Sequence, residues 1–358
     1  MEVDLIMGSK LLFTFIFSLL IIMCLPTALA LEVKTLSEPQ IIHESTPDYF
    51  VRLSVSDDRY IVMPEFHLKK DKTGRVHLYD LSQHSLSTIP ESLSAAGSNV
   101  VVANGVIYFI GTNGFYSYIP ESNTLVKLDI SVSSGGNGFA TDGVHFINWY
   151  GNYWPRDLTF MLYNFQTGEK KQIFPGGYPD PNNPMFLSGD YFVYSDSGML
   201  VADPSKRYLY AYNISSGETT TLPKENGYSQ YLENIWGDTI VYSLFSLVDN
   251  EYPDPLQYRM LNLKTHEKEP LILPNGIHPS QIYPPHALMS QWDEGTGVIT
   301  VKLVEVDLPP IVRSTIVSQM EEQTLSPQPT QTGTPLGMTV GLIAFALACV
   351  LAVLWRKK

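Results

Sequence analysis

The chain has 358 residues, of which 44% are hydrophobic, and its formal net charge is −13 at neutral pH. This excess of acidic side chains argues against nucleic acid as a partner, because the phosphate backbone is itself strongly negative. Its two cysteines, Cys24 and Cys349, lie in apolar segments at opposite ends, so the region between them must fold without disulfides. That fits an exported prokaryotic domain of this size better than a small animal ectodomain.

The first thirty residues have the organisation of a secretory signal peptide. Lys10 is followed by an uncharged run at 11–25, and this run is followed by Pro26 and the small-residue pattern Ala28-Leu29-Ala30. A charged start, a short apolar run and such a cleavage pattern predict a signal peptide at 1–30 that is cut after Ala30. An uncleaved signal anchor is the alternative, although the apolar run is short for a span of about 20 residues.

Residues 31–313 show a weak self-similarity with a period of roughly 40–50 residues, the spacing that propeller arrays produce. Each copy combines a short apolar strand, a turn containing Gly, Asp or Asn, an aromatic and β-branched strand, and a strand pair joined by a polar turn. The five clear copies occupy 54–90, 100–128, 138–175, 185–223 and 234–274, and a degenerate copy lies at 281–308. We therefore expect an all-β ectodomain, a β-propeller of about six four-stranded blades.

The last copy is short of a strand, whereas Glu32 to Ile42 is a strand-like segment that precedes the first copy. We expect this N-terminal strand to complete the last blade, because a closed ring leaves only short sheet edges. One pattern consists of Gly189-Asp190, an apolar strand and then YLYAYNISSGE at 208–218. It resembles TolB-like six-bladed propellers of prokaryotic, including archaeal, surface proteins. The likeness covers most of 45–305. TolB-like propellers close in this manner. The kelch double glycine and the Trp-Asp signature of WD40 repeats are absent.

The C-terminal region predicts attachment to a membrane. Residues 314–335 are rich in Ser, Thr, Gln and Pro and predict an extended stalk. Residues 336–355 carry no charge and predict a transmembrane helix, followed by a basic cytoplasmic tail at 356–358. The chain is thus expected at the cell surface as a single-pass protein with its N-terminus outside. Gly337 and Gly341 have the spacing of a helix-dimerisation motif, which would make a homodimer, and ordinary filler is the alternative.

In an up-and-down blade, the first and third turns lie at one end and the second loop and the blade linker at the other. The first and third turns here are short, so the long loops are expected to gather at one face, where binding sites usually lie. The densest group there is predicted to bind a sugar or a protein through exposed aromatic rings and polar neighbours. It comprises Trp149, Tyr150, Tyr153, Trp154, Arg156 and Asp157. Packing of these rings as loop core is the alternative.

Two further sites follow from residue type alone. Oxygen ligands for Ca²⁺ could come from Asp180, Asp249, Glu251 and Asp254, although no calcium-loop spacing is present and a solvated acidic rim is the alternative. No other cofactor is expected. Asn213 begins the only N-x-S/T acceptor for glycosylation, and a plain turn residue is the alternative reading.

The exported region contains no G-x-S-x-G, H-E-x-x-H or P-loop motif, no cysteine nucleophile, and no metal-ligand spacing among its histidines. His77 and His145 alternate within predicted strands and are interpreted as packing or surface residues. The sequence therefore favours a non-catalytic binding, adhesion or scaffold module for carbohydrate or protein ligands. Two alternatives stay open, namely an extracellular glycosidase or lyase with carboxylates in the propeller channel, and a structural component of the cell envelope.

Overall fold

A computed structural model describes the greater part of the ectodomain, and these residues belong to one compact unit, Met1–Thr315. The described residues are 30–51, 55–67, 73–91, 93–94, 100–130, 139–150, 158–177, 179, 183–196, 203, 206–247 and 257–308. Within them, no helix is long and apolar enough to cross a membrane. The predicted signal peptide, apart from Ala30, and the predicted stalk, transmembrane helix and tail lie outside the described residues.

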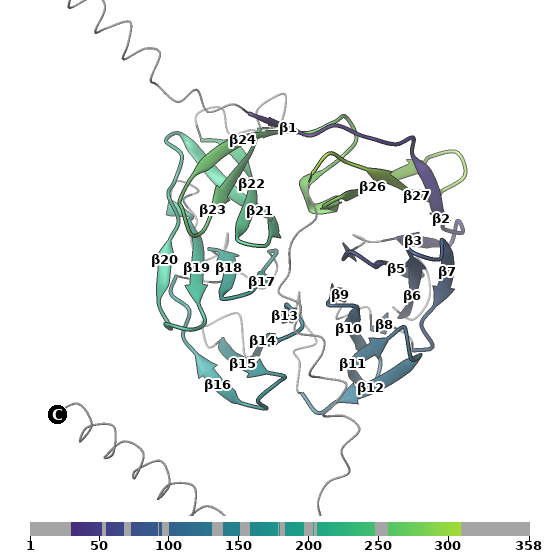
Figure 1. Ribbon diagram of the computed structural model, residues 1–358, viewed down its shortest axis with the longest axis horizontal. Helices are drawn as coiled ribbons and strands as arrows, with labels where there is room; N and C mark the ends of the chain where they lie inside the picture. Colours follow the sequence, from purple (N-terminus) through teal and green to yellow (C-terminus); the bar gives the residue numbers. More distant parts are fainter. Residues whose placement is uncertain are drawn as a thin grey trace, which may run out of the picture. The chain divides into compact units, whose positions relative to one another are not determined.

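The strands form six blades around a common centre, as the repeat predicts (Figure 1). Blade 1 consists of β3 (Tyr49–Val51), β4 (Val55–Ser56), β5 (Tyr60–His67), β6 (Thr73–Asp80) and β7 (Ser85–Thr88). Blade 2 consists of β9 (Val100–Ala103), β10 (Val106–Gly111), β11 (Gly114–Ile119) and β12 (Thr124–Leu128). The short strand β8 (Leu93–Ser94) pairs with both β6 and β10. It joins blades 1 and 2 into one ten-stranded sheet.

The other four blades repeat the same antiparallel meander. Blade 3 contains β13 (Phe139–Thr141), β14 (His145–Tyr150), β15 (Thr159–Asn164) and β16 (Lys170–Ile173), and blade 4 contains β17 (Phe186–Ser188), β18 (Tyr191–Ser195), β19 (Leu209–Asn213) and β20 (Thr219–Thr221). Blade 5 contains β21 (Tyr228–Trp236), β22 (Thr239–Ser246), β23 (Tyr258–Asn262) and β24 (Lys268–Ile272). The short 3₁₀ helix η2 (Pro279–Gln281) leads into blade 6, which contains β25 (Ile282–Tyr283), β26 (His286–Asp293) and β27 (Val298–Glu305).

The core consists of apolar clusters between neighbouring blades, one at each of the six seams. Successive side chains of a strand point to opposite faces of its sheet. Val62 on β5 therefore packs against blade 2, whereas Ile61 and Met63 pack against blade 6. Because β10 and β18 are buried on both faces, these strands are almost continuously apolar rather than alternating.

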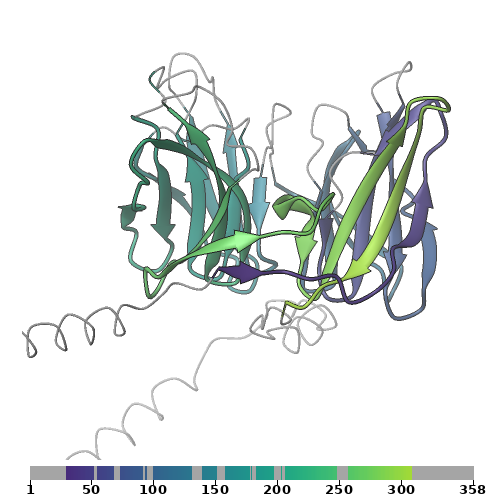
Figure 2. The same ribbon diagram turned by 90° about the horizontal axis from the view of Figure 1, so that it is seen from above.

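The N-terminal strand closes the ring, which confirms the expectation from the sequence. Strand β2 (Gln40–Glu44) pairs antiparallel with β27 as the outermost strand of blade 6. The segment that precedes β2 extends to blade 5, where β1 (Leu31–Glu32) pairs parallel with β24. Figure 2 shows this purple segment running from β24 to blade 6. The single strand predicted at 32–42 is therefore divided between two blades, because Val33 inserts its side chain into the core between blades 5 and 6.

The first turns of blades 1, 2 and 3 are tied to one another. The carboxylate of Asp57 accepts hydrogen bonds from the backbone N–H groups of its own turn and, through Oδ2, from the N–H of Gly105 in blade 2. The side chain of Asn104 donates in turn to the carbonyl of Asp142 in blade 3. Gly143, next in that turn, has a φ of +86°, and a Cβ there would lie 2.7 Å from the Asn104 amide nitrogen.

We expect Gly143→Ala to destabilise the chain more than Gly168→Ala. Both glycines have a left-handed φ, of +86° and +70°, but a Cβ at position 168 meets nothing within 4 Å. The Gly168 variant should lose about 1–2 kcal/mol for the backbone conformation alone. The Gly143 variant should also lose the bond between blades 2 and 3, worth about 1 kcal/mol more. Chemical denaturation of both variants measures the difference, and equal losses would contradict the role of the Asn104 contact.

Candidate functional site

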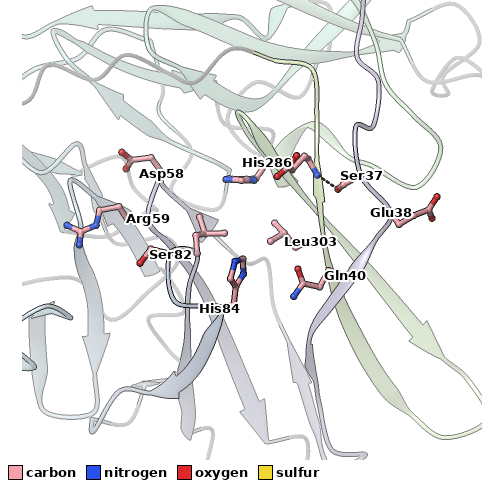
Figure 3. A pocket seen from close by; sticks show the side chains of 11 residues that line it. Ser37, Glu38, Gln40, Asp58, Arg59, Ser82, His84, His286 and Leu303 are labelled. Carbon is pink, nitrogen blue, oxygen red and sulfur yellow. Dashed lines mark hydrogen bonds between the residues drawn. The ribbon is translucent and has the colours of Figure 1, made fainter.

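A pocket with a volume of about 420 Å³ lies at the seam between blade 6 and blade 1. Figure 3 shows its walls coming from these two blades. Blade 1 contributes Asp58, Arg59, Leu81, Ser82 and His84, and the closing blade with the segment before β2 contributes Ser37, Glu38, Gln40, His286, Leu303 and Glu305. Most of these side chains can donate or accept hydrogen bonds, and Leu81 and Leu303 are the apolar ones.

Short turns hold the blade 1 side of the pocket in place. Asp58 and Arg59 lie in the turn between β4 and β5, which the neighbouring Asp57 carboxylate caps. Ser82 and His84 lie in the turn between β6 and β7, where Oδ1 of Asp80 accepts hydrogen bonds from three groups of that turn. The pocket is therefore at the short-turn end of the blades, whereas the sequence predicted a ligand site at the long-loop end.

His286 is the most informative residue of the pocket. It is the first residue of β26, opposite Glu305 of β27, and its Nδ1 is buried without a hydrogen-bond partner among the described residues. Burial lowers the pKa of His286, and the Glu305 charge opposes that shift only in part. The ring is therefore neutral at neutral pH, with one nitrogen that has hydrogen-bonding capacity to spare.

The pocket carries more negative than positive charge. Glu38, Asp58 and Glu305 line it as exposed carboxylates. Its one cation, Arg59, forms an ion pair with Glu121, which lies outside the pocket lining. Such a lining attracts hydroxyl or ammonium donors and repels anions.

A second polar cluster lies deeper at the same seam. The fully buried Glu65 carboxylate contacts Nε2 of His43 at 3.4 Å, Nε2 of His77 at 3.0 Å and Nε of Arg75 at 2.5 Å. Burial alone would raise the pKa of Glu65, but the hydrogen bonds from His43, His77 and Arg75 outweigh it and hold the pKa well below its usual range. Thr88 contacts the other nitrogen of His77 at 3.0 Å.

The sequence interpretation of His77 as a packing or surface residue was therefore incomplete, because the ring is buried against a carboxylate. A signal was present in the sequence. Glu65 is the only charged side chain in the otherwise apolar run from Tyr60 to Phe66, and a charge in such a strand requires partners. The partner His43 comes from a strand that joins this region only when the ring closes.

Most of the predicted aromatic site lies outside the described residues. This applies to Tyr153, Trp154, Arg156, Asp157 and the side chain of Tyr150. Trp149 is described, and it is only 1% exposed. Its ring packs in the core between blades 3 and 4, with Phe160 at 6.1 Å between ring centroids. The expectation of an exposed ring is therefore wrong at this position, because Trp149 is an inward-facing residue of β14.

The remaining predicted positions have mixed outcomes. The four calcium candidates, Asp180, Asp249, Glu251 and Asp254, lie outside the described residues. Asn213 ends β19, and its side-chain oxygen accepts a hydrogen bond from the Ser216 N–H at 2.8 Å. Asn213 thus holds the turn, and its glycosylation stays a prediction.

Glu233 is a partly buried acid at a bulge in β21. Ser243 donates a hydrogen bond to it at 2.5 Å, and His278 lies 3.8 Å away. Burial raises the pKa of Glu233, against smaller opposing effects of Ser243 and His278.

Because the folded-state pKa of Glu233 is raised, the protonated acid is favoured in the fold and stability falls as pH rises through that pKa. We expect Glu233→Gln to match the wild type near about pH 4 and to be more stable by on the order of 1 kcal/mol at about pH 8. Gln keeps the acceptor for Ser243 without the buried charge. Denaturation curves at both pH values measure this, and a variant that is less stable at both would show that ionised Glu233 is favoured.

No protein-family model matches the chain, and no curated protein matches it. Among solved structures, it is similar to an oligogalacturonate lyase from Vibrio parahaemolyticus, with 10% identity, coverage of 77% of this chain and 97% of that one, and a TM-score of 0.41. It is also similar to a putative TolB from Agrobacterium tumefaciens, with 10% identity, coverage of 76% and 90%, and a TM-score of 0.39. At this identity the similarity concerns the fold alone.

Proposed function

We propose that this chain is a membrane-anchored cell-surface β-propeller that acts as a non-catalytic binding module, and that the pocket between blades 6 and 1 holds a carbohydrate. The observation that carries the proposal is Nδ1 of His286, which is buried without a hydrogen-bond partner in the described part of the chain and belongs to a polar pocket of about 420 Å³. That volume falls within the range of small-ligand sites, about 300–1,000 Å³. Carboxylate, amide and imidazole groups line this pocket, and sugar hydroxyls can bond to each of them.

The charge of the pocket narrows the class of sugar. Glu38, Asp58 and Glu305 would repel uronic and sialic acids, and Arg59 is already paired with Glu121. Neutral sugars or amino sugars are therefore the expected ligands. The predicted signal peptide and transmembrane helix would present this pocket outside the cell.

The test is a glycan array probed with the full chain purified in mild detergent. Saturable binding to neutral or amino-sugar glycans is expected, and Glu38→Gln/Glu305→Gln should weaken it at least about tenfold, the effect of about 1.4 kcal/mol. The control Glu169→Gln/Glu218→Gln makes the same charge change on exposed turns of blades 3 and 4 and should bind like the wild type. No binding by the folded chain, or preference for anionic glycans, would overturn the proposal.

A second candidate function, glycosidase or lyase chemistry, is favoured by one observation. Glu233 is a partly buried carboxylic acid with a raised pKa beside His278, and a raised pKa suits a general acid. Cleavage of a polysaccharide by the wild type that is lost in Glu233→Gln would support it. Unchanged cleavage in that variant would exclude Glu233 as the acid.

A further inference from the structure

Three side chains that metal ions favour lie together at the seam between blades 6 and 1. His43 comes from β2, Glu65 from β5 and His77 from β6, and one ligand atom of each lies within 4.8 Å of the others. Glu65 is fully buried, and each histidine is 8% exposed. The cluster thus combines two imidazole nitrogens and one carboxylate oxygen in a largely buried site.

The contact between His43 and Glu65 is longer than most hydrogen bonds and has the length expected for two ligands of one ion, whereas His77 Nε2 lies at hydrogen-bond distance, 3.0 Å, from Glu65 Oε2. His43 Nε2 and Glu65 Oε1 are 3.4 Å apart, whereas N–H···O bonds usually span about 2.9–3.0 Å. Two ligands held about 2.0–2.1 Å from a tetrahedral zinc ion lie about 3.4 Å apart. Within the described part of the chain, this long contact is the only one that either of these two side-chain atoms makes to a hydrogen-bonding partner.

The surrounding residues orient the cluster as outer-shell groups orient metal ligands. Thr88 Oγ1 lies 3.0 Å from His77 Nδ1. When Thr88 accepts the Nδ1 proton, the lone pair of Nε2 faces Glu65, and an ion can replace the proton that otherwise joins Nε2 to Oε2 at 3.0 Å. Arg75 binds Glu65 through Oε2, which leaves Oε1 available. The Arg75 side chain is 41% exposed and lies over the Tyr49 ring at 4.2 Å, so solvent screens its charge.

We propose that His43, Glu65 and His77 form a binding site for a divalent ion of the zinc class. Two nitrogen donors and one carboxylate are ligands that Zn²⁺ accepts and that Ca²⁺ and Mg²⁺ do not prefer. The ion would join the closing strand β2 to blade 1, so that it stabilises the ring where its two ends meet. This site does not depend on the pocket or on its ligand.

The test is metal content and thermal stability of the full chain in mild detergent. After incubation with Zn²⁺ and removal of free ion, about one zinc per chain is expected by elemental analysis, and EDTA should lower the Tm because an ion that binds only the folded state stabilises it. Titration with Co²⁺ should give the visible absorption bands of tetrahedral coordination. A chain that retains no zinc, shows no Co²⁺ bands and has the same Tm with Zn²⁺ and EDTA would overturn the site.

Variants separate the metal site from a plain ion-pair network. His43→Gln and His77→Gln should each abolish zinc retention, and Thr88→Val should weaken zinc binding by about tenfold or more. Arg75→Gln should retain zinc, because Arg75 is not a ligand. Loss of zinc in Arg75→Gln but not in the histidine variants would contradict the assignment. Because the Co²⁺ spectrum is measured on the wild type, the proposal can fail even if a variant does not fold.

Discussion

Deletion of residues 31–44 is expected to abolish cooperative folding of the propeller. The deletion removes β1 and β2, and with them the outermost strand of blade 6 and the side chain of Val33 in the core between blades 5 and 6. It also exposes the edge of β27, and an open sheet edge promotes aggregation. The expected loss is comparable with the whole stability of a domain, about 5–15 kcal/mol. Calorimetry and size-exclusion chromatography of the purified variant measure it.

Two adjacent isoleucines of β2 provide a matched control for the deletion. Ile42 is 6% exposed and packs between blades 6 and 1, whereas Ile41 is 54% exposed. Ile42→Ala should cost about 2–5 kcal/mol because it leaves a cavity. Ile41→Ala should stay within about 0.5 kcal/mol of the wild type. Equal effects of the two substitutions, or a deletion variant with a sharp thermal transition near that of the wild type, would contradict closure by this strand.

Replacement of Trp149 by Ala is expected to be the most damaging single substitution outside the closing strand. The ring is fully enclosed between blades 3 and 4 by a cluster that includes Phe160, Leu187 and Phe192. Truncation of such a side chain costs about 3–5 kcal/mol. Denaturant titration of the full chain measures this loss.

Trp149→Phe distinguishes packing from any polar role of the indole. The indole N–H is buried without a partner among the described residues, so Phe removes an uncompensated donor along with part of the ring. We expect Phe to recover most of the stability that Ala loses. An Ala variant as stable as the wild type, with reduced ligand binding, would instead support the exposed-ring interpretation drawn from the sequence.

The blade architecture could be predicted from the sequence because its signals are local. Short apolar runs such as β10 and β18 are recognisable as strands, and turns such as Asp142-Gly143 and Gly189-Asp190 separate consecutive strands. Even the closing strand followed from counting strands in the last copy. The division of this strand between two blades could not be predicted in the same way, because it depends on the burial of Val33 between blades 5 and 6.

The candidate site was harder to predict because it forms between distant segments. Glu65 and His43 are 22 residues apart, and His286 reaches the same seam only because the last blade meets the first. The aromatic cluster at 149–157 was a local signal, and it misled at Trp149 because the strand β14 continues through that residue. The exposure of a side chain at the end of a strand depends on where the neighbouring blade ends, and this cannot be predicted from a single sequence.

Hydrogen–deuterium exchange of the full chain, with and without the glycan that binds best on the array, tests the location of the binding site most directly. Slower exchange is expected at 37–40, 58–59, 81–84, 286 and 303–305, the segments that contribute the lining of the pocket between blades 6 and 1. Exchange in the outer strands of blades 3 and 4, far from this seam, should not change. Protection confined to segments outside the pocket, or no protection by a glycan at saturating concentration, would contradict the assignment of this pocket as the ligand site.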